Sequence, residues 1–518
     1  IEYHYKLYSD YFSHIDNWMM QEELPMLYNQ YKITIPHVFV YNIELRGKDY
    51  IQVKQRDSSI HATEREGSGA GGVSKDFTVS AQETTFISRN LPAIRQDESY
   101  CWCPEDYKVQ VSFDLQGTQF TPNEYKPYSQ KWEDVDKQLL KPENTQFGEH
   151  LSLTNPFRPE TKQAYNSEMN FEEKIICAFQ VLKKKMAWNG RYQLYSKELE
   201  KVIKKGSGSN ADLNFILISI LKDFGLEAYP VVMSRRSSGM LPYNFPSLQK
   251  LNTFFVAIHD INKQKYVFLD SSMDVPAFNI LPLELSVNKA RMLSLKEKEE
   301  KKWVNVMALS HNKSFMKIDA RIEGNQVKGH RSTVLYGQEA IEYQANENHK
   351  QDNLVSNPEN KVSQKEKLTV TNLKVKKQEN DWALIEEEFD FVLQADRTDD
   401  HLYINPMLFP QLKSNPFIQT ERVLPIEFPY PYKFTMLSTL TLPEGYEVEE
   451  LPQSQSIRSE GDGLQCKYMI QQQGNTILLN YVFHLKGYIF LSEQYKQLQE
   501  LWAKVIEKNN ALIVLKKI

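Results

Sequence analysis

The chain has 518 residues, of which 25% are charged and 41% hydrophobic, and its formal net charge is -5. At roughly 150 residues per domain, this length predicts about three domains. Phosphate binding needs clustered positive charge, so the slightly acidic balance predicts no nucleic-acid partner. The sequence has no run of the roughly 18 apolar residues that a membrane-spanning helix requires, so we expect no membrane span.

The cysteines predict neither a disulfide scaffold nor a metal centre. There are only four, Cys101, Cys103, Cys177 and Cys466, and the first two form C-x-C rather than the C-x-x-C of zinc and redox sites. We interpret Cys101 and Cys103 as strand residues that behave as small hydrophobes. The count alone leaves the disulfide status of all four open.

The chain begins abruptly with "IEYHYKLYSDYF", residues 1–12, which reads as a strand without an initiator Met or a signal peptide. We infer that Ile1 is not the native start. This leaves room for a lost targeting segment, and for membrane association through the missing N-terminus.

Residues 1–128 are predicted to form a β domain. Alternating, β-branched or aromatic stretches indicate strands near residues 31–36, 37–45, 49–55, 77–88 and 107–115. The Gly/Ser-rich segment from Glu64 to Asp76 is predicted to be a flexible hairpin connection.

From Ser129 the apolar residues recur at helical spacing. This predicts helices within residues 129–140, 171–188, 196–205 and 210–225, followed by strands within 227–236, 251–260 and 265–272. Helices first and antiparallel strands afterwards favour an α+β arrangement. The charged run from Ser294 to Trp303 is predicted to be a solvated connector.

A second β region is predicted from Val304 onward. It ends in an amphipathic helix that we expect to begin at a Ser492 cap and to bury Tyr495, Leu498, Trp502 and Val505. Residues 511–517 then read as a terminal strand.

The Gly/Ser turn from Gly206 to Ala211 fits a loose G-x-G-x-x-A, the pattern that seats a dinucleotide on a helix N-terminus. Such a turn must follow a buried strand, whereas the preceding "SKELEKVIKK" is charged and helical in period. No GK[ST] follows either. We therefore expect no nucleotide and no other cofactor.

The segment "KKGSGSNADLNFILISILKDFGLEAYPVVMSRR" resembles the nucleophile helix of bacterial transglutaminase-like proteins, which have a papain-like core. Stretches such as "WNGRY", "LNTFFVAIHDINKQKYVFLDSS" and "NPFIQTERVLPIEFPYPYKF" extend the resemblance over almost the whole chain. It implies an α+β multidomain protein. A transglutaminase-like (papain-like) α/β core at 129–295 would lie between two mainly antiparallel β-sandwich-type domains, at 1–128 and 304–518.

The same resemblance implies where a Cys-His-Asp site would lie. The cysteine's position falls on Asn210, the histidine's on Thr253 or, if the register shifts by one, Phe254, and the aspartate's on Asp270. Neither Asn nor Thr nor Phe supplies a nucleophile or a base near pH 7. We therefore expect no catalytic residues. Asp270 also fits a purely structural role as a strand-end residue that caps backbone amides.

Substitute catalytic residues can be sought nearby. Ser207 and Ser209 adjoin the site, but a serine needs an adjacent base. His259 lies six residues after Thr253, about 20 Å along an extended strand. Cys177 lies among apolar residues of a predicted helix and is expected in the core.

The leading hypothesis is a non-catalytic transglutaminase-like envelope protein, a binding or scaffold module whose former active-site cleft lacks nucleophile and base. One alternative is a hydrolase or acyltransferase with a rearranged site, and another is a carbohydrate-binding or adhesion module. The resemblance implies a periplasmic or outer-membrane-associated location, with an unidentified protein, peptide or glycan as partner.

Overall fold

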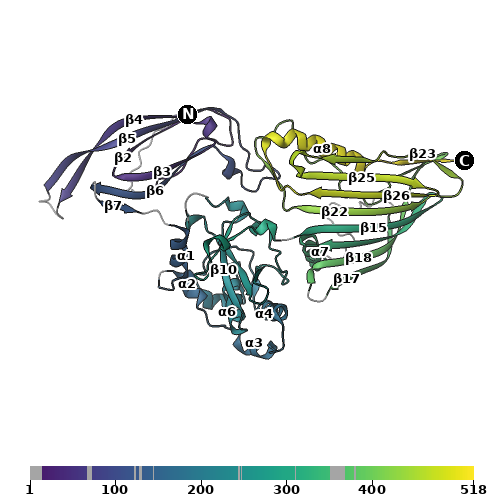
Figure 1. The fold of residues 1–518 in the computed structure, drawn as a ribbon, viewed down its shortest axis with the longest axis horizontal. Helices are drawn as coiled ribbons and strands as arrows, with labels where there is room; N and C mark the ends of the chain where they lie inside the picture. The colour runs from purple at the N-terminus through teal and green to yellow at the C-terminus, as the bar shows by residue number, and fades with distance from the viewer. Residues whose placement is uncertain are drawn as a thin grey trace. The chain divides into compact units, whose positions relative to one another are not determined.

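The structure, a computed structural model, describes residues 15–66, 73–121, 124–127, 131–143, 145–242, 246, 248–309, 311–349, 368–378 and 381–518. The strand predicted at residues 1–12 lies outside them, as does the middle of the predicted Gly/Ser-rich loop, 67–72. The chain divides into two compact units, 1–135 with 242–248 and 136–241 with 249–518. Figure 1 shows the order of the elements along the chain.

The first unit consists of strands in two sheets. One sheet has the antiparallel order β2-β5-β4, and the other has the order β1-β6-β3 with β7 beside β6. Hydrophobic side chains from both sheets, including Phe86, Val111 and Phe113, form one shared core. The all-β character predicted for this part is confirmed. The strands are β1 (Trp18–Met19), β2 (Met26–Pro36), β3 (Phe39–Arg46), β4 (Gln52–Glu66), β5 (Val73–Leu91), β6 (Gln110–Thr121) and β7 (Glu124–Pro127).

Two local predictions in this unit are wrong. The hairpin connection is shorter than predicted, because β4 and β5 continue to pair as far as Glu66 and Val73. Cys101 and Cys103 do not lie on a strand but are half-buried in the segment between β5 and the 3-10 helix η2 (Pro104–Tyr107). The backbone turns there, since Tyr100 has a φ of 58° and a proline follows Cys103.

In the second unit one buried helix, α6, packs on a five-stranded antiparallel sheet of order β12-β11-β10-β13-β14. α4 and α2 also contact α6. The predicted helices and strands of this part are confirmed, except that the helix predicted over 171–188 ends at Lys185 and its last two residues form strand β8. The short helices α2 and α3 were not predicted. The elements are α1 (Trp132–Leu140), α2 (Gln146–Leu151), α3 (Arg158–Ala164), α4 (Phe171–Lys185), β8 (Ala187–Trp188), α5 (Leu199–Lys205), β9 (Ser207–Gly208), α6 (Asn210–Asp223), β10 (Glu227–Met233), β11 (Thr253–Asp260), β12 (Lys265–Leu269), β13 (Ala290–Met292) and β14 (Trp303–Val304).

The charged run is not simply a solvated connector. Lys302 is buried, and its ammonium lies 2.9 Å from the Asp136 carboxylate of α1. Arg291 of β13 is fully buried and pairs with both Asp136 and Glu299. Because these charges leave water together, they neutralise one another inside the fold. The charged run leads into β14, the last strand of the five-stranded sheet. This sheet therefore continues beyond residue 295, where the transglutaminase-like core was predicted to end.

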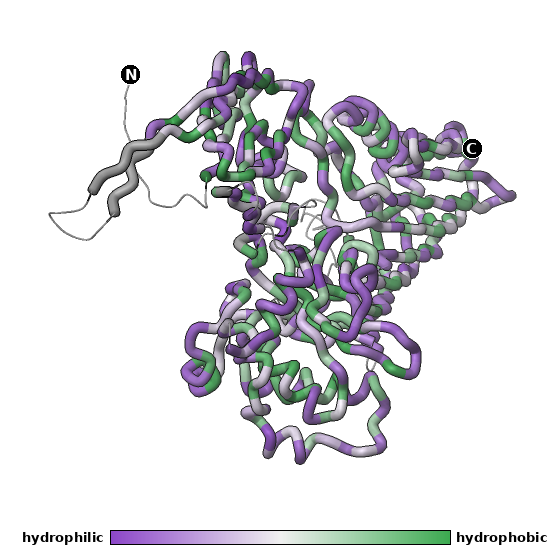
Figure 2. The backbone as a smooth tube through the Cα atoms, turned by 60° about the vertical axis from the view of Figure 1, so that its left-hand side comes forward, coloured by the Kyte–Doolittle hydropathy of each residue, from purple (hydrophilic) through white to green (hydrophobic). Residues whose placement is uncertain are grey.

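The remaining part of the second unit is mainly antiparallel, as predicted. Its eight-stranded sheet has the order β17-β18-β16-β15-β22-β26-β25-β24, with one parallel pair, β15 and β22. Buried and exposed residues alternate strictly along β15, and Figure 2 shows the corresponding alternation of hydropathy in this sheet. A four-stranded sheet has the order β19-β20-β28-β23. The elements are β15 (Asn312–Glu323), β16 (Gln326–Tyr336), α7 (Gln338–His349), β17 (Thr369–Gln378), β18 (Asp381–Gln394), β19 (Asp396–Thr398), β20 (His401–Ile404), β21 (Ile426–Glu427), β22 (Tyr432–Thr441), β23 (Tyr446–Glu450), β24 (Gln455–Arg458), β25 (Leu464–Gln473), β26 (Thr476–Leu485), β27 (Ile489–Phe490), α8 (Tyr495–Asn509) and β28 (Ile513–Lys517).

Helix α8 buries the face predicted for it, Tyr495, Leu498, Trp502 and Val505. The prediction that Ser492 caps this helix is wrong. A 3-10 turn, η10 (Ser492–Gln494), precedes α8, and the side chain of Gln494 accepts a hydrogen bond from the backbone N–H of Leu491. None of the described helices is long and apolar enough to cross a membrane.

Candidate functional site

The Gly/Ser turn shapes the start of helix α6. Gly206 ends α5 with a φ of 71°, a left-handed conformation that suits glycine. Gly208 is needed for close packing, since a Cβ there would lie 2.5 Å from Cγ1 of Val202. Ser209 is the N-cap, and its hydroxyl and the Asp212 carboxylate form a reciprocal capping box. Asn210 is therefore the first helical residue.

Asn210 is fully buried, and its side chain is saturated with hydrogen bonds. Its Oδ1 accepts from the backbone N–H of Gln193 at 3.0 Å. Its Nδ2 donates to Oγ1 of Thr253 at 2.8 Å and to the carbonyl of Phe254 at 3.0 Å, with Asp270 Oδ2 at 3.4 Å. The backbone N–H donates to the Arg191 carbonyl. The carboxamide thus joins α6 to β11 and to the segment that follows β8.

Of the two candidates for the histidine's position, Thr253 turns its side chain toward Asn210 and Phe254 does not. The Thr253 hydroxyl faces Asn210, while the Phe254 ring packs among aromatic side chains, with its centroid 4.8 Å from that of Phe215 and 5.1 Å from that of Phe147. Successive side chains of a strand point to opposite faces, so only one of the two can face Asn210. Phe254 contributes its carbonyl oxygen instead.

Asp270, directly after β12, is also buried. Its Oδ1 accepts from the backbone and the hydroxyl of Ser272, and its Oδ2 accepts from Nδ2 of Asn214 at 2.8 Å. Burial raises the pKa of Asp270, while the hydrogen bonds from Ser272, Asn214 and Asn210 oppose that shift. The structure therefore brings Asn210, Thr253 and Asp270 together. That they are the family's former catalytic positions stays a prediction.

Asn214 belongs to this cluster and was missed by sequence reasoning. It follows Asn210 by four residues and so lies on the same face of α6. Its Oδ1 accepts from the Ser271 backbone, and its Nδ2 donates to Phe254 as well as to Asp270. The signal was present, since a second Asn at i+4 inside an otherwise apolar helix implies a buried polar partner.

The side chains of the cluster are closed to solvent. Asn210 and Thr253 are 0% exposed, and Asp270 is 1% exposed. The backbone of residues 191–193 covers part of the cluster, because it hydrogen-bonds to the backbone N–H and to the side-chain oxygen of Asn210. A substrate therefore has no direct access to these three side chains.

Toward the surface, a chain of hydroxyls leads away from Asp270. Ser272 donates to Asp270, and its Oγ lies 3.3 Å from the hydroxyl of the half-buried Tyr192. Burial is the main cause that raises the pKa of Tyr192. Nearby, Lys183 of α4 donates to the Ser271 carbonyl at 3.4 Å, and burial lowers the pKa of its ammonium.

The substitute catalytic residues do not assemble. The Ser209 hydroxyl donates to Asp212 at 2.7 Å, and Cys177 is buried in α4 with the Ala164 carbonyl 3.6 Å from its sulfur. Around the start of α6, the described residues include no histidine hydrogen-bonded to a serine or a cysteine. No group of His, Cys, Asp and Glu among the described residues is arranged to hold a metal ion.

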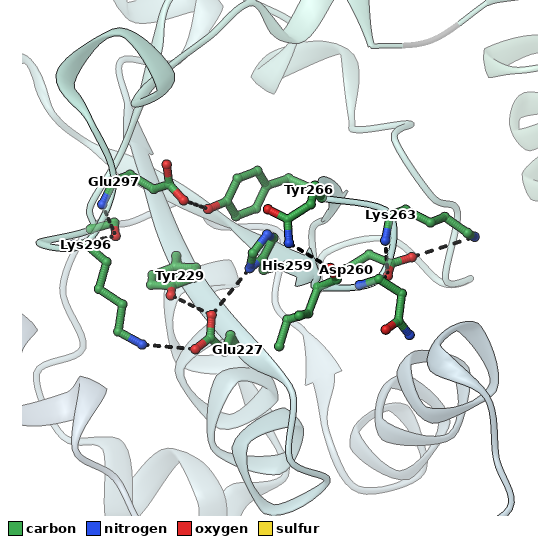
Figure 3. A network of polar contacts seen from close by, with 12 residues as sticks. Glu227, Tyr229, His259, Asp260, Lys263, Tyr266, Lys296 and Glu297 are labelled. Atoms are coloured by element: carbon green, nitrogen blue, oxygen red, sulfur yellow. Dashed lines mark hydrogen bonds and ion pairs between the residues drawn. The ribbon is translucent and has the colours of Figure 1, made fainter.

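His259 lies at the far end of β11 from Thr253, in a separate polar network that Figure 3 shows. Its Nδ1 is 3.4 Å from Glu227 Oε2, and its ring stacks on Tyr266 with centroids 4.8 Å apart. Glu227 also accepts from Tyr229 and Lys296, and the hydrogen bond from Lys296 is the main cause that lowers its pKa. His259 is therefore not available to the α6 cluster.

Comparison with known proteins identifies one domain. Residues 400–515 match the model of DUF3858, a domain of unknown function with a solved structure. No curated protein matches the chain.

Two crystal structures are similar to the chain. One, from Parabacteroides distasonis, is described as a "putative protease"; it has a TM-score of 0.49 and 13% identity, over 96% of this chain and 74% of that one. The other, from Cytophaga hutchinsonii, is described as a "putative cysteine protease"; it has a TM-score of 0.17 and 11% identity, over 48% of this chain and 80% of that one. Likeness at this level carries no argument about the activity of this chain.

Proposed function

We propose that this protein is a non-catalytic, transglutaminase-like binding or scaffold module of the cell envelope. The observation that carries the proposal is the state of Asn210. Its carboxamide occupies the position that the family resemblance gives to the nucleophile, and it is fully buried with every donor and acceptor engaged. A buried group whose amide hydrogens and oxygen are all engaged stabilises the fold and is closed to a substrate.

The chemistry of the cluster supports the proposal. Acyl transfer through a covalent intermediate needs a nucleophile activated by a neighbouring base. An amide is not such a nucleophile, and the Thr253 hydroxyl is not a base near pH 7. Asp270 is the one ionisable group of the three, and its hydrogen bonds come from Ser272, Asn214 and Asn210 rather than from an imidazole.

The partner and the location remain part of the proposal. We infer a periplasmic or outer-membrane-associated protein that binds a protein, peptide or glycan, with the sheets that precede and follow the α6 region in the chain as scaffold. Fold alone does not decide function. The proposal therefore has to be tested at the site.

The test is covalent labelling of the intact chain. A peptidyl thiol-directed electrophile and a serine-directed fluorophosphonate are applied, labelled residues are mapped by mass spectrometry, and cleavage or transamidation of a peptide library is followed in parallel. We expect no activity-dependent labelling within residues 177–272 and no turnover. Labelling of Ser209, Ser272 or Cys177 that tracks with turnover and is lost in the corresponding Ala variant would refute the proposal and support the hydrolase or acyltransferase alternative.

A further inference from the structure

A second group of polar side chains lies where the Asp270 hydroxyl chain reaches the surface. We call it the rim cluster; its members are Tyr192, Arg235, Ser237, Ser272 and Glu284. The Tyr192 ring packs on the hydrophobic cluster that contains Met233 and Leu285. The 3-10 turn Arg236–Ser238 contacts the turn Leu283–Leu285, which places Arg235 and Glu284 beside each other. The residues of the rim cluster thus come from four separate segments of the second unit.

Arg235 has hydrogen-bonding capacity that the described residues do not use. Its backbone is held by Asn252, which accepts from the Arg235 N–H at 3.0 Å. The side chain is 32% exposed, and its Nε is buried without a hydrogen-bond partner among the described residues. A guanidinium carries five N–H donors in a planar fork that matches a carboxylate. Since Nε is closed to solvent, an anionic ligand would reach the Nη1 and Nη2 end of this fork.

The carboxylate of Glu284 offsets the positive charge of Arg235, so the rim cluster carries one charge of each sign. Oε1 of Glu284 lies 3.6 Å from Nη1 of Arg235, an ion pair beyond hydrogen-bonding distance. The Ser237 hydroxyl donates to the same oxygen. The carboxylate is 22% exposed. A simple anion would meet the repulsion of Glu284, whereas a ligand with a carboxylate and an adjacent N–H or ammonium group complements both side chains.

Tyr192 and Ser272 connect this surface to the buried cluster. The Tyr192 hydroxyl is within 3.3 Å of the Ser272 hydroxyl, which donates to Asp270. Both Arg235 and Glu284 are close enough to Tyr192 to act on it electrostatically. Because the one hydroxyl hydrogen of Ser272 goes to Asp270, Tyr192 is the donor in its contact with Ser272. The Tyr192 oxygen is therefore a further acceptor for a ligand held between Arg235 and Glu284.

We propose that the rim cluster binds a free amino acid or a dipeptide, with the ligand's carboxylate on Arg235 and its ammonium group on Glu284. This inference deepens the proposed function, on which it rests, by naming the class of ligand that the non-catalytic module binds. The Tyr192 hydroxyl oxygen accepts a hydrogen bond from an N–H at the side of the ligand. The saturated Asn210 beneath remains uninvolved.

The test compares L-alanyl-L-alanine with its C-terminal amide and its N-acetyl form on the unaltered full-length chain, by isothermal titration calorimetry up to about 10 mM. The amide cannot form the charge-assisted hydrogen bonds with Arg235, so it should bind at least about tenfold more weakly than the free acid. The N-acetyl form also binds more weakly, since it lacks the charge that Glu284 attracts. Arg235→Gln reduces the affinity for the free acid at least about tenfold, whereas the matched control Arg321→Gln, an exposed arginine paired with Glu323, leaves it unchanged.

Equal binding of acid and amide, unchanged binding by Arg235→Gln, or no binding of any form would overturn the rim site. Because the ligand comparison needs no variant, it holds even if Arg235→Gln fails to fold. The same samples are analysed chromatographically for free alanine. Cleavage of the dipeptide would refute the non-catalytic function while leaving the carboxylate preference standing. Equal binding without cleavage would refute the rim site alone.

Discussion

Replacing the two asparagines of α6 by alanine, singly and together, tests how the buried cluster is held. In Asn210→Ala, the Phe254 carbonyl and Asp270 Oδ2 each keep the hydrogen bond from Asn214. In Asn214→Ala, Asn210 still reaches the same two acceptors, at 3.0 and 3.4 Å. In the double variant both acceptors lose their amide donors. The two substitutions should therefore be more harmful together than their separate effects imply.

The magnitude follows from the hydrogen bonds. Each single variant loses three hydrogen bonds of 3.0 Å or shorter. At about 1 kcal/mol for each bond, together with part of a buried side chain, the loss is about 3–4 kcal/mol. The double variant adds a buried carbonyl and a carboxylate oxygen without amide donors, at about 1–3 kcal/mol for each orphaned group. We therefore expect a coupling free energy of about 1–3 kcal/mol between the two sites, in the destabilising direction.

The assay is native-state hydrogen exchange of the full chain, read on peptides from α6, β11 and β12. Local exchange is preferred because a multidomain chain does not unfold in a single two-state transition. Asn262→Ala is the matched control, an exposed asparagine in the turn between β11 and β12, and it should change protection by less than about 0.5 kcal/mol. Additive effects of the two asparagine variants, or protection unchanged in Asn210→Ala, would refute the view that Asn210 and Asn214 share their acceptors.

Three further predictions concern neighbouring and more distant groups. Thr253→Val keeps the shape of the side chain but removes the acceptor for Asn210, and should lower the local stability of β11 by about 1–2 kcal/mol in hydrogen exchange; an unchanged value would mean that this bond contributes nothing. Asp136→Ala removes the partner of the fully buried Arg291 and of Lys302, and should destabilise α1 and β13 by about 3–5 kcal/mol in the same assay, in contrast to removal of the exposed Lys317–Asp319 pair. Burial raises the pKa of Glu339 on α7 to about 7, above the value of 4.5 in the unfolded chain. The folded state therefore holds the proton of Glu339 more tightly than the unfolded state does. The stability that this proton contributes is present below about pH 4.5 and is lost as the pH rises to about 7. Glu339→Gln should thus be about 1–3 kcal/mol more stable than the unaltered chain at pH 8 and closely similar at pH 4, and the opposite pH trend in thermal unfolding would contradict the assigned burial.

The strongly patterned elements could be predicted from the sequence. Helix α6 is apolar on nearly every side and begins after a serine cap, so both its helical structure and its burial could be predicted. Strands β10, β11 and β12 are rich in β-branched and aromatic residues and also lie where predicted. Three helices were not predicted, namely the short α2 and α3 and the partly polar α7. Their apolar residues recur at helical spacing over too few positions to indicate a helix.

The composition of the site was predictable, but its closure was not. The family resemblance placed Asn210 at the site and left the strand position open between Thr253 and Phe254. Only the three-dimensional structure showed that the backbone of Arg191 and Gln193 covers Asn210. Backbone hydrogen bonds of this kind depend on the path of a loop and leave no side-chain pattern in the sequence. The same holds for the buried charges around Arg291, which come from segments more than 150 residues apart.

The closure has a physical logic if Asn210 occupies a former nucleophile's position. A working nucleophile and base need access for substrate and unspent hydrogen-bonding capacity, so an active site tends to lower the stability of the fold around it. Once an amide takes the nucleophile's place, its donors and acceptor can all be satisfied internally, and the backbone at residues 191–193 can close over them. Saturation and closure then reinforce each other, because a closed site makes each unmet polar group more costly. On this argument any remaining binding capacity belongs at the rim, where Arg235 still has donors to offer, and not at the helix terminus where catalysis would have been.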